Sequence, residues 1–184
     1  MKKKVKNNRE MTDTILDIIY EDERWRETLP QIEVIAEKIK TATFNYVSEH
    51  ENLKILRADK PLCIGLCLSN DEQVRALNRD YRGMDKPTNV LSFANIDFAD
   101  FNNENVNFAE IELGNIILAY ETMKREAESE MISLEEHFCH LLTHGFLHIL
   151  GYDHIKEDEA EQMEALEVAI LQKLNISNPY EEDK

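Results

Sequence analysis

The sequence predicts an α+β fold: a mixed sheet of about four strands, with helices mostly on one side and a metal site on a helix. Two observations lead to this fold class. Short segments rich in β-branched residues are interspersed with longer segments of helical periodicity, in the order β-α-β-α-β-β-α-α-α. Residues 61–68 are apolar on both faces, as expected for a central strand.

The chain before this central strand is expected to form one strand and one long helix. Residues 14–20 are a short β-branched segment, which indicates a strand. Trp25, in the charged connection that follows, is expected to pack on the domain. From Pro30, which suits a first helical turn, apolar residues recur at helical spacing to about His50.

After the central strand, Ser69 and Glu72 form a capping-box pattern that predicts the start of a short helix. The residues expected to face the core from this helix are Val74, Leu77 and Tyr81. The remaining segments are predicted as a loop at 82–89, a strand at 90–96, an exposed loop at 97–110, a strand at 111–118, and helices at 119–130, from the Ser133 capping box onward, and at 156–174.

Length and composition favour one domain covering residues 1–184, with residues 1–12 polar and expected to be flexible. The net charge of −16 argues against general affinity for nucleic acid or anionic membranes, so any such contact needs a local basic patch. Three cysteines in apolar stretches fit free thiols in a reducing cytoplasm. We find neither a signal peptide nor an apolar run long enough to span a membrane, and we expect a cytoplasmic protein.

All but one of the six histidines lie within residues 137–154. His140, His144 and His148 are spaced four apart and therefore line one face of a helix. Two imidazoles one turn apart can bind one cation. Gly151 favours the left-handed conformation that ends a helix, so the chain can turn and bring His154 back as a third ligand. Three imidazoles with one open position are typical of a catalytic site for one Zn²⁺ ion.

The stretch from His144 to His154 keeps the ligand spacing of the zinc-protease pattern His-Glu-x-x-His-x-x-Gly-x-x-His, but Gly145 replaces the glutamate. This change removes the usual general base of peptide hydrolysis and is expected to open space beside the metal. A phosphodiester needs less from a base, because the metal and neutralising cations carry more of the reaction. A closed structural site would need a fourth ligand, and Cys139 lies about 140° around the helix from His144.

Positive side chains close to a metal would favour a phosphate substrate. Arg82 and Lys86 lie in the 82–89 loop of this acidic protein, and an arginine can hold two phosphate oxygens at once. Arg75 and Arg79 on the preceding helix either extend this patch or are ordinary surface charges.

Several residues near the predicted site have two possible roles. His137 and His140 are either hydrogen-bonding partners of the ligands or structural residues, and Asp153 either orients His154 or forms the turn. The tail 179–184 is predicted to be a solvated end.

Three stretches resemble the YbeY family of bacterial endoribonucleases: residues 77–93 with Tyr-Arg-Gly and Lys-Pro-Thr-Asn-Val-Leu-Ser-Phe, residues 112–117 with Glu-Leu-Gly-Asn, and residues 140–154. Their order and spacing match the family over roughly residues 60–175. Two positions depart from the family pattern, Asn115 in place of aspartate and Ala94 in place of proline. If that aspartate tunes the site, Asn115 would leave the site without its charge.

The resemblance implies that His144, His148 and His154 bind the zinc ion and that Arg82 is important for RNA cleavage. It implies a zinc-dependent, single-strand-specific endoribonuclease that acts in ribosomal RNA maturation, at the small-subunit RNA end, and in ribosome quality control. The implied partners are single-stranded and ribosomal RNA, the ribosome, the small-subunit protein uS11 and the GTPase Era.

Two other functions stay open at this point. The first is a non-catalytic, ribosome-associated assembly factor with a structural zinc, because an acidic surface also suits docking to basic ribosomal proteins. The second is a metzincin-like metalloprotease, which would keep the same ligands but would need another general base.

Overall fold

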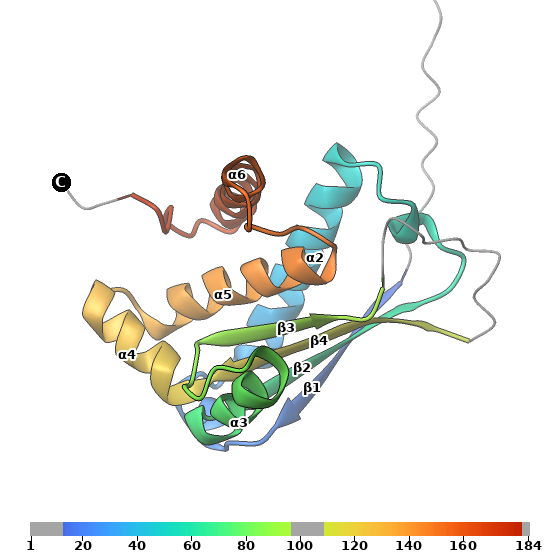
Figure 1. The fold of residues 1–184 in the computed structure, drawn as a ribbon. Helices are drawn as coiled ribbons and strands as arrows, with labels where there is room; N and C mark the ends of the chain where they lie inside the picture. The colour runs from blue at the N-terminus through green and yellow to red at the C-terminus, as the bar shows by residue number, and fades with distance from the viewer. Residues whose placement is uncertain (1–12, 97–108, 182–184) are drawn as a thin grey trace, which may run out of the picture.

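A computed structural model of the chain describes residues 13–96 and 109–181 and shows a sheet flanked by helices (Figure 1). The four strands of the sheet lie in the order β1-β2-β4-β3. Strands β1 (Thr14–Tyr20), β2 (Leu62–Ser69) and β4 (Ile111–Ala119) are parallel, and β3 (Val90–Ala94) is antiparallel to β4. The predicted mixed sheet is confirmed, and the strand that is apolar on both faces, β2, is indeed central.

The helices are distributed unequally over the two faces of the sheet, as predicted (Figure 1). They are α1 (Arg24–Thr28), α2 (Ile32–His50), α3 (Asp71–Arg82), α4 (Tyr120–Glu130), α5 (Leu134–Ile149) and α6 (Glu157–Lys173), with a 3₁₀ turn at Lys54–Arg57. Helices α2 and α5 pack on one face and carry α6 outside them, whereas α3 covers part of the other face. The fold class predicted from the sequence is therefore confirmed.

The main core fills the space between the sheet and helices α2 and α5. Phe44 of α2 and Phe146 of α5 meet edge to face with ring centroids 5.9 Å apart, and neither is exposed. Alternation along β4 turns Ile116 toward α5 and Ile117 toward α3, where Ile117 joins a smaller cluster with Val74. Burial on both faces holds the sheet rigidly beneath α5.

Two predictions about α3 were wrong in detail. The N-cap is Asn70, whose Oδ1 accepts a hydrogen bond from the Gln73 N–H at 3.1 Å, whereas Ser69 ends strand β2. The chain is still extended at Ser69, so the helix can start only one residue later. Tyr81 is 70% exposed, because it lies in the last turn of α3, where its ring packs edge to face with that of Phe93.

Other local predictions were confirmed. Trp25 is fully buried, and its indole N–H donates to the Ser69 carbonyl oxygen at 2.8 Å. The capping box of α5 has both of its hydrogen bonds, because Ser133 Oγ accepts from the Glu136 N–H and Glu136 Oε2 accepts from the Ser133 N–H. The three cysteines are free thiols.

Some predictions lie outside the described residues, namely the flexible segment 1–12 and most of the predicted loop at 97–110. Within the part of the chain that the structure describes, none of the helices combines the length and the apolarity needed to cross a membrane.

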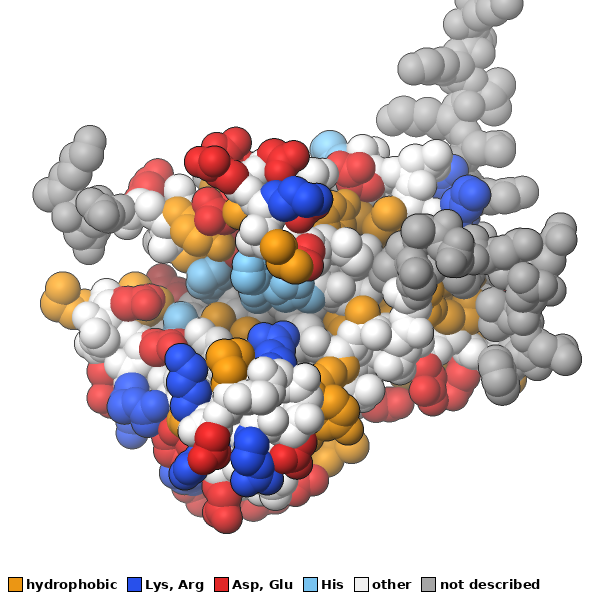
Figure 2. Space-filling view, viewed as in Figure 1, with side chains coloured by type: hydrophobic (Ala, Val, Ile, Leu, Met, Phe, Trp, Pro, Cys, Tyr) orange, Lys and Arg blue, Asp and Glu red, His pale blue; other side chains and the backbone are white. Residues whose placement is uncertain are grey.

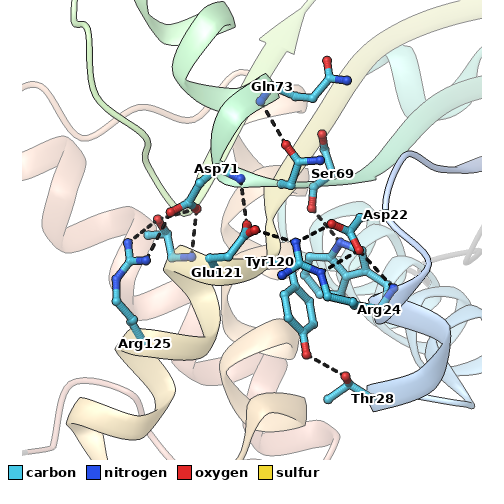
Figure 3. Close-up of polar contacts among 12 residues, drawn as sticks. Asp22, Arg24, Thr28, Ser69, Asp71, Gln73, Tyr120, Glu121 and Arg125 are labelled. Atoms are coloured by element: carbon cyan, nitrogen blue, oxygen red, sulfur yellow. Dashed lines mark hydrogen bonds and ion pairs between the residues drawn. The ribbon is translucent and has the colours of Figure 1, made fainter.

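The N-termini of α3 and α4 cap each other (Figure 3). Asp71 Oδ1 accepts hydrogen bonds from the N–H and the hydroxyl of Thr122 in α4, and Glu121 Oε2 accepts from the Asp71 N–H in α3. Two arginines complete this arrangement, Arg24 beside Glu121 and Arg125 beside Asp71. We call Asp22, Arg24, Asp71, Glu121 and Arg125 the Asp71 cluster. It fixes α3, the helix that ends in Arg82.

Candidate metal centre

The end of α5 brings the predicted third histidine back toward the other two. Gly151 has a φ of 91°, the left-handed conformation predicted for it. The Tyr152 N–H donates to the Leu147 carbonyl and the Gly151 N–H donates to the His148 carbonyl, both at 3.0 Å. This pair of bonds is a Schellman motif, which reverses the chain and places His154 beside the last turn of the helix.

The three predicted ligands converge in the structure. His144, His148 and His154 each offer a ring nitrogen, and these three atoms lie within 4.8 Å of one another. The Nε2 atoms of His144 and His148 are 3.0 Å apart. Cys139 is buried away from this group. Among the described residues, the group contains no fourth protein ligand.

Hydrogen bonds fix the tautomers of the two helical histidines. His144 Nδ1–H donates to Glu167 Oε1 at 2.8 Å, and His148 Nδ1–H donates to the Tyr152 carbonyl oxygen at 3.0 Å. Because a carboxylate and a carbonyl can only accept, both Nδ1 atoms carry the hydrogen, and in the neutral rings both Nε2 atoms present lone pairs. Two lone pairs 3.0 Å apart repel each other unless a proton or a metal ion lies between them.

The electrostatics keep His148 in the form that binds a metal ion. Burial, together with the neighbouring His144, lowers the pKa of His148 to about 4, so this imidazole is neutral near pH 7. Neutral imidazole is the form that binds metals. The donor set, three ring nitrogens from one helix and its following turn, therefore fits a divalent transition-metal ion, zinc among them.

Glu167 of α6 is the residue beside the histidines that the sequence analysis missed. Its side chain is 1% exposed, and its Oε2 accepts hydrogen bonds from Tyr180 O–H at 2.5 Å and His140 Nε2–H at 3.0 Å. Burial alone would raise the pKa of Glu167, but the hydrogen bonds from His140 and His144 lower it to about 2. One signal was present in the sequence, because Glu167 lies on the apolar stripe between Met163 and Ile170.

The prediction that the tail from 179 is a solvated end holds for the exposed residues Tyr180 and Glu181, but the Tyr180 hydroxyl also reaches Glu167. The reason is tertiary: the chain turns back after α6 and the tail packs beside α5. We call Glu167, His140, His144 and Tyr180 the Glu167 cluster. Residues 182–184 lie outside the described part of the chain.

The histidines open onto a cleft of about 460 Å³. Figure 2 shows the histidine side chains in a hollow of the surface, with basic side chains gathered on its lower side. The cleft is lined from β3 and the preceding loop by Thr88, Asn89, Val90 and Ser92, and from the turn after α5 by Asp153 and Ile155. The prediction that the ligand face of the helix points into a cleft is confirmed.

Arg82 also lines this cleft, although most of α3 lies on the far face of the sheet. It is the last residue of α3, and Gly83 with a φ of 70° turns the chain directly after it. The following loop is held by Asn78, which is 1% exposed and whose Nδ2–H donates to the Lys86 carbonyl at 2.8 Å. Among the described residues, Arg82 forms no ion pair.

The other basic residues predicted near the site are placed differently. Arg75 pairs with Asp85 at 2.8 Å and Arg79 pairs with Asp80 at 2.9 Å, and neither arginine lines the cleft. Arg75 and Arg79 are therefore ordinary surface charges, and they do not extend the basic patch at the cleft.

Gly145 has a different role from the one predicted. A Cβ atom there would lie 2.9 Å from Ile116 Cγ2 and 3.3 Å from Ser92 Oγ. The expected space beside the metal is thus filled by side chains of the sheet, so that prediction was wrong. Glycine lets α5 approach the sheet closely, and a glutamate at this position would collide with β4.

Three further residues considered in the sequence analysis, His137, Asp153 and Asn115, lie outside the group of three converging histidines. His137 Nε2 hydrogen-bonds to Glu126 Oε2 at 2.9 Å, and this carboxylate also accepts from Asn89 at the cleft. Asp153 Oδ1 accepts from the His154 N–H at 2.8 Å, which is a turn-forming contact. Asn115 is exposed on the face of the sheet opposite α5, since Ile116 beside it faces that helix. Its missing charge is therefore remote from the histidines.

Comparison with known proteins points to one family. The family model described as endoribonuclease YbeY matches residues 20–175, and so begins well before the region of resemblance in the sequence. A protein named endoribonuclease YbeY from Paramagnetospirillum magneticum is 40% identical over 158 residues, which cover 86% of this chain and 90% of that protein. One of the same name from Magnetococcus marinus is 51% identical over 123 residues, 65% of this chain and 84% of that protein.

A solved structure supports the fold alone. The solution structure of TM1509 from Thermotoga maritima superposes with a TM-score of 0.50 at 19% sequence identity. The match covers 91% of this chain and 100% of that chain.

Proposed function

This chain belongs to the YbeY family, and on that premise we propose that it is a zinc-dependent endoribonuclease that cleaves single-stranded RNA. The observation that carries the proposal is the convergence of His144, His148 and His154 on one point of an open cleft. In this proposal residues 1–184 form one metallohydrolase domain.

Each proposed site residue has its own role. His144, His148 and His154 would hold the metal through their ring nitrogens. Bound there, zinc supplies Lewis-acid chemistry and acidifies water near neutral pH. Arg82, exposed at the cleft and unpaired among the described residues, would bind the phosphate that is cleaved.

The geometry favours a nuclease over the two alternatives. A metalloprotease of this pattern needs a glutamate at position 145, where the sheet leaves no room for a side chain. A closed structural zinc needs a fourth protein ligand, and the ligand group formed by the described residues has three histidines beside a cleft.

The finer part of the proposal comes from family resemblance. We place the enzyme in the cytoplasm, in maturation of the small-subunit ribosomal RNA end and in ribosome quality control. Its partners would be ribosomal RNA, the ribosome, uS11 and the GTPase Era.

RNA cleavage by the purified, zinc-loaded chain tests this function. We expect cleavage of a single-stranded RNA and little cleavage of the same RNA in a duplex. His148→Ala, which removes one ligand, should reduce the rate to background. Arg82→Glu should lower the rate by about 100-fold, because a phosphate contact that strengthens during the reaction is lost.

Arg79→Glu is the matched control, because it makes the same charge change one helical turn away, outside the cleft. It should retain most of the activity. Cleavage that survives both His148→Ala and Arg82→Glu would identify a contaminating nuclease and contradict the proposal. Ribosome association without any cleavage would instead favour the non-catalytic assembly factor.

A further inference from the structure

The two helical ligands are held in different ways. His148 donates its Nδ1–H to the Tyr152 carbonyl, which belongs to the turn that ends its own helix. His144 donates its Nδ1–H to Glu167, which belongs to α6. The orientation of His148 is therefore a local property of α5, whereas that of His144 depends on the docking of another helix.

The Glu167 carboxylate accepts hydrogen bonds from three side chains. Its Oε1 is used by His144, and its Oε2 is used by Tyr180 and His140. These donors come from α5 and from the segment after α6, so one buried carboxylate joins two parts of the chain. Because the carboxylate is 1% exposed, water cannot replace a lost partner at low cost.

The segment after α6 reaches Glu167 through a defined turn. Asn175 has a φ of 59°, the Asn175 N–H donates to the Gln172 carbonyl, and the Ile176 N–H donates to the Leu171 carbonyl. This is the same helix-ending motif that brings His154 to the site, here with asparagine in the left-handed position. It directs the chain back along α5, where the Tyr180 ring lies edge-on to His140 with centroids 5.5 Å apart.

We propose that Glu167 is the positioning residue of the metal centre and that Tyr180 holds Glu167 in place. Glu167 keeps the hydrogen on Nδ1 of His144 and aims its Nε2 at the ion. Tyr180 occupies the outer oxygen of the carboxylate and prevents it from rotating away from His144. The segment after α6 thereby controls metal affinity. The inference rests on the proposed function only in that the histidines bind a metal.

The proposed positioning of His144 by Glu167 and Tyr180 can be tested without RNA. The measurement is the zinc affinity of the full chain, determined by competition with a chromophoric chelator at fixed pH. Glu167→Gln keeps the shape but not the charge, and should weaken zinc binding by about 10- to 100-fold. Tyr180→Phe removes one hydroxyl from a partly exposed ring and should weaken binding by about 3- to 10-fold. Tyr20→Phe is the matched control, because it removes a tyrosine–carboxylate hydrogen bond, to Glu33, on strand β1. It should leave the affinity within about twofold.

A double variant separates positioning from general loosening of the fold. If Tyr180 acts through Glu167, Tyr180→Phe should have almost no further effect in the Glu167→Gln background. The metal-free chain gives a second readout, because ¹⁵N chemical shifts of the His144 ring should show Nδ1–H in the unaltered protein and a mixture of tautomers in Glu167→Gln.

The outcomes are distinguishable. Weaker zinc binding in Glu167→Gln and Tyr180→Phe, with non-additivity and the tautomer change, supports the inference even if RNA is not cleaved. Unchanged affinity in both variants, or an equal loss in Tyr20→Phe, overturns it while the proposed function stands. Failure of the unaltered chain to bind zinc overturns both.

Discussion

The Glu167 cluster and the Asp71 cluster are both built on carboxylates that join separate helices, but they differ in burial and in the groups they serve. In the Asp71 cluster, the side chains of Asp71 and Glu121 are 22% and 35% exposed, and they accept hydrogen bonds from backbone N–H groups at two helix starts. In the Glu167 cluster, the carboxylate is 1% exposed, and its hydrogen-bond partners His140, His144 and Tyr180 are all side chains.

This difference distinguishes the Asp71 cluster, which stabilises a helix junction, from the Glu167 cluster, which we propose positions a metal ligand. Helix N-termini carry unsatisfied N–H groups that water can also serve, so the Asp71 cluster stabilises the junction of α3 and α4 by a modest amount. Imidazole tautomers depend on which atom accepts their hydrogen, and a buried carboxylate determines this at a defined position. We therefore expect the two clusters to respond differently to metal, to substitution and to salt.

Metal addition should give the largest effect and should separate the two clusters. Zinc at a free concentration 1,000-fold above its Kd should raise the free energy of unfolding by about 4 kcal/mol, because only the folded chain presents the three histidines together. Amide hydrogen exchange with and without zinc should show slower exchange in α5, the turn after it and α6, and little change where α3 meets α4. In His148→Ala the effect should disappear. Equal protection of both regions would contradict the comparison.

Removing Asp71 should have an intermediate effect that is independent of metal. Helix α4 has Ala119 at its N-cap position, and Asp71 supplies the capping oxygen from another helix. Asp71→Ala should therefore lower the free energy of unfolding by about 1–2 kcal/mol, measured in urea, and leave zinc affinity unchanged. Asp80→Ala, which removes an exposed aspartate paired with Arg79, should change the free energy of unfolding by less than about 0.5 kcal/mol. A loss of zinc affinity in Asp71→Ala would show that the clusters are coupled.

The smallest effect is expected from Arg24, whose side chain is 44% exposed between Asp22 and Glu121. Arg24→Met keeps the apolar stem and should cost below about 1 kcal/mol, because exposed ion pairs are screened by water and salt. The difference from the unaltered chain should shrink further in about 1 M salt, where the Debye length is about 3 Å. A larger, salt-independent loss would mean that the hydrogen bonds from the guanidinium to Asp22 and Glu121, and not the screened charge, hold the junction.

Local patterns predicted much of the site. The spacing of His144 and His148, the glycine at 151 and the capping box at Ser133 are each decided within a few residues, so the sequence sufficed to predict the ligand helix and its end. The chain was likewise found to resemble the correct family, and the family match confirms this. The central position of β2 also followed from its own residues, since only a strand covered on both faces is apolar on both.

The residues that the sequence analysis misjudged around the metal centre share one feature, dependence on a distant segment. Gly145 was read as open space, and the Ile116 side chain fills it. The tail was predicted to be a solvated end, and Tyr180 is indeed exposed, but the contact of its hydroxyl with a buried carboxylate was missed. Glu167 was not predicted as a residue of the site, although it occupies the apolar stripe of α6. Each error came from a contact between elements whose relative placement no local pattern specifies.

The sequence by itself determined which residues can act as ligands and how the helix that carries them begins and ends, because spacing, capping and left-handed turns are short-range properties of the chain. Only the tertiary structure decided what surrounds those histidines: the close approach of α5 to the sheet, the position of Arg82 at the end of a helix on the far face, and the carboxylate that accepts from His144. These depend on how helices and strands pack, which is determined by burial of the whole core rather than by any one segment.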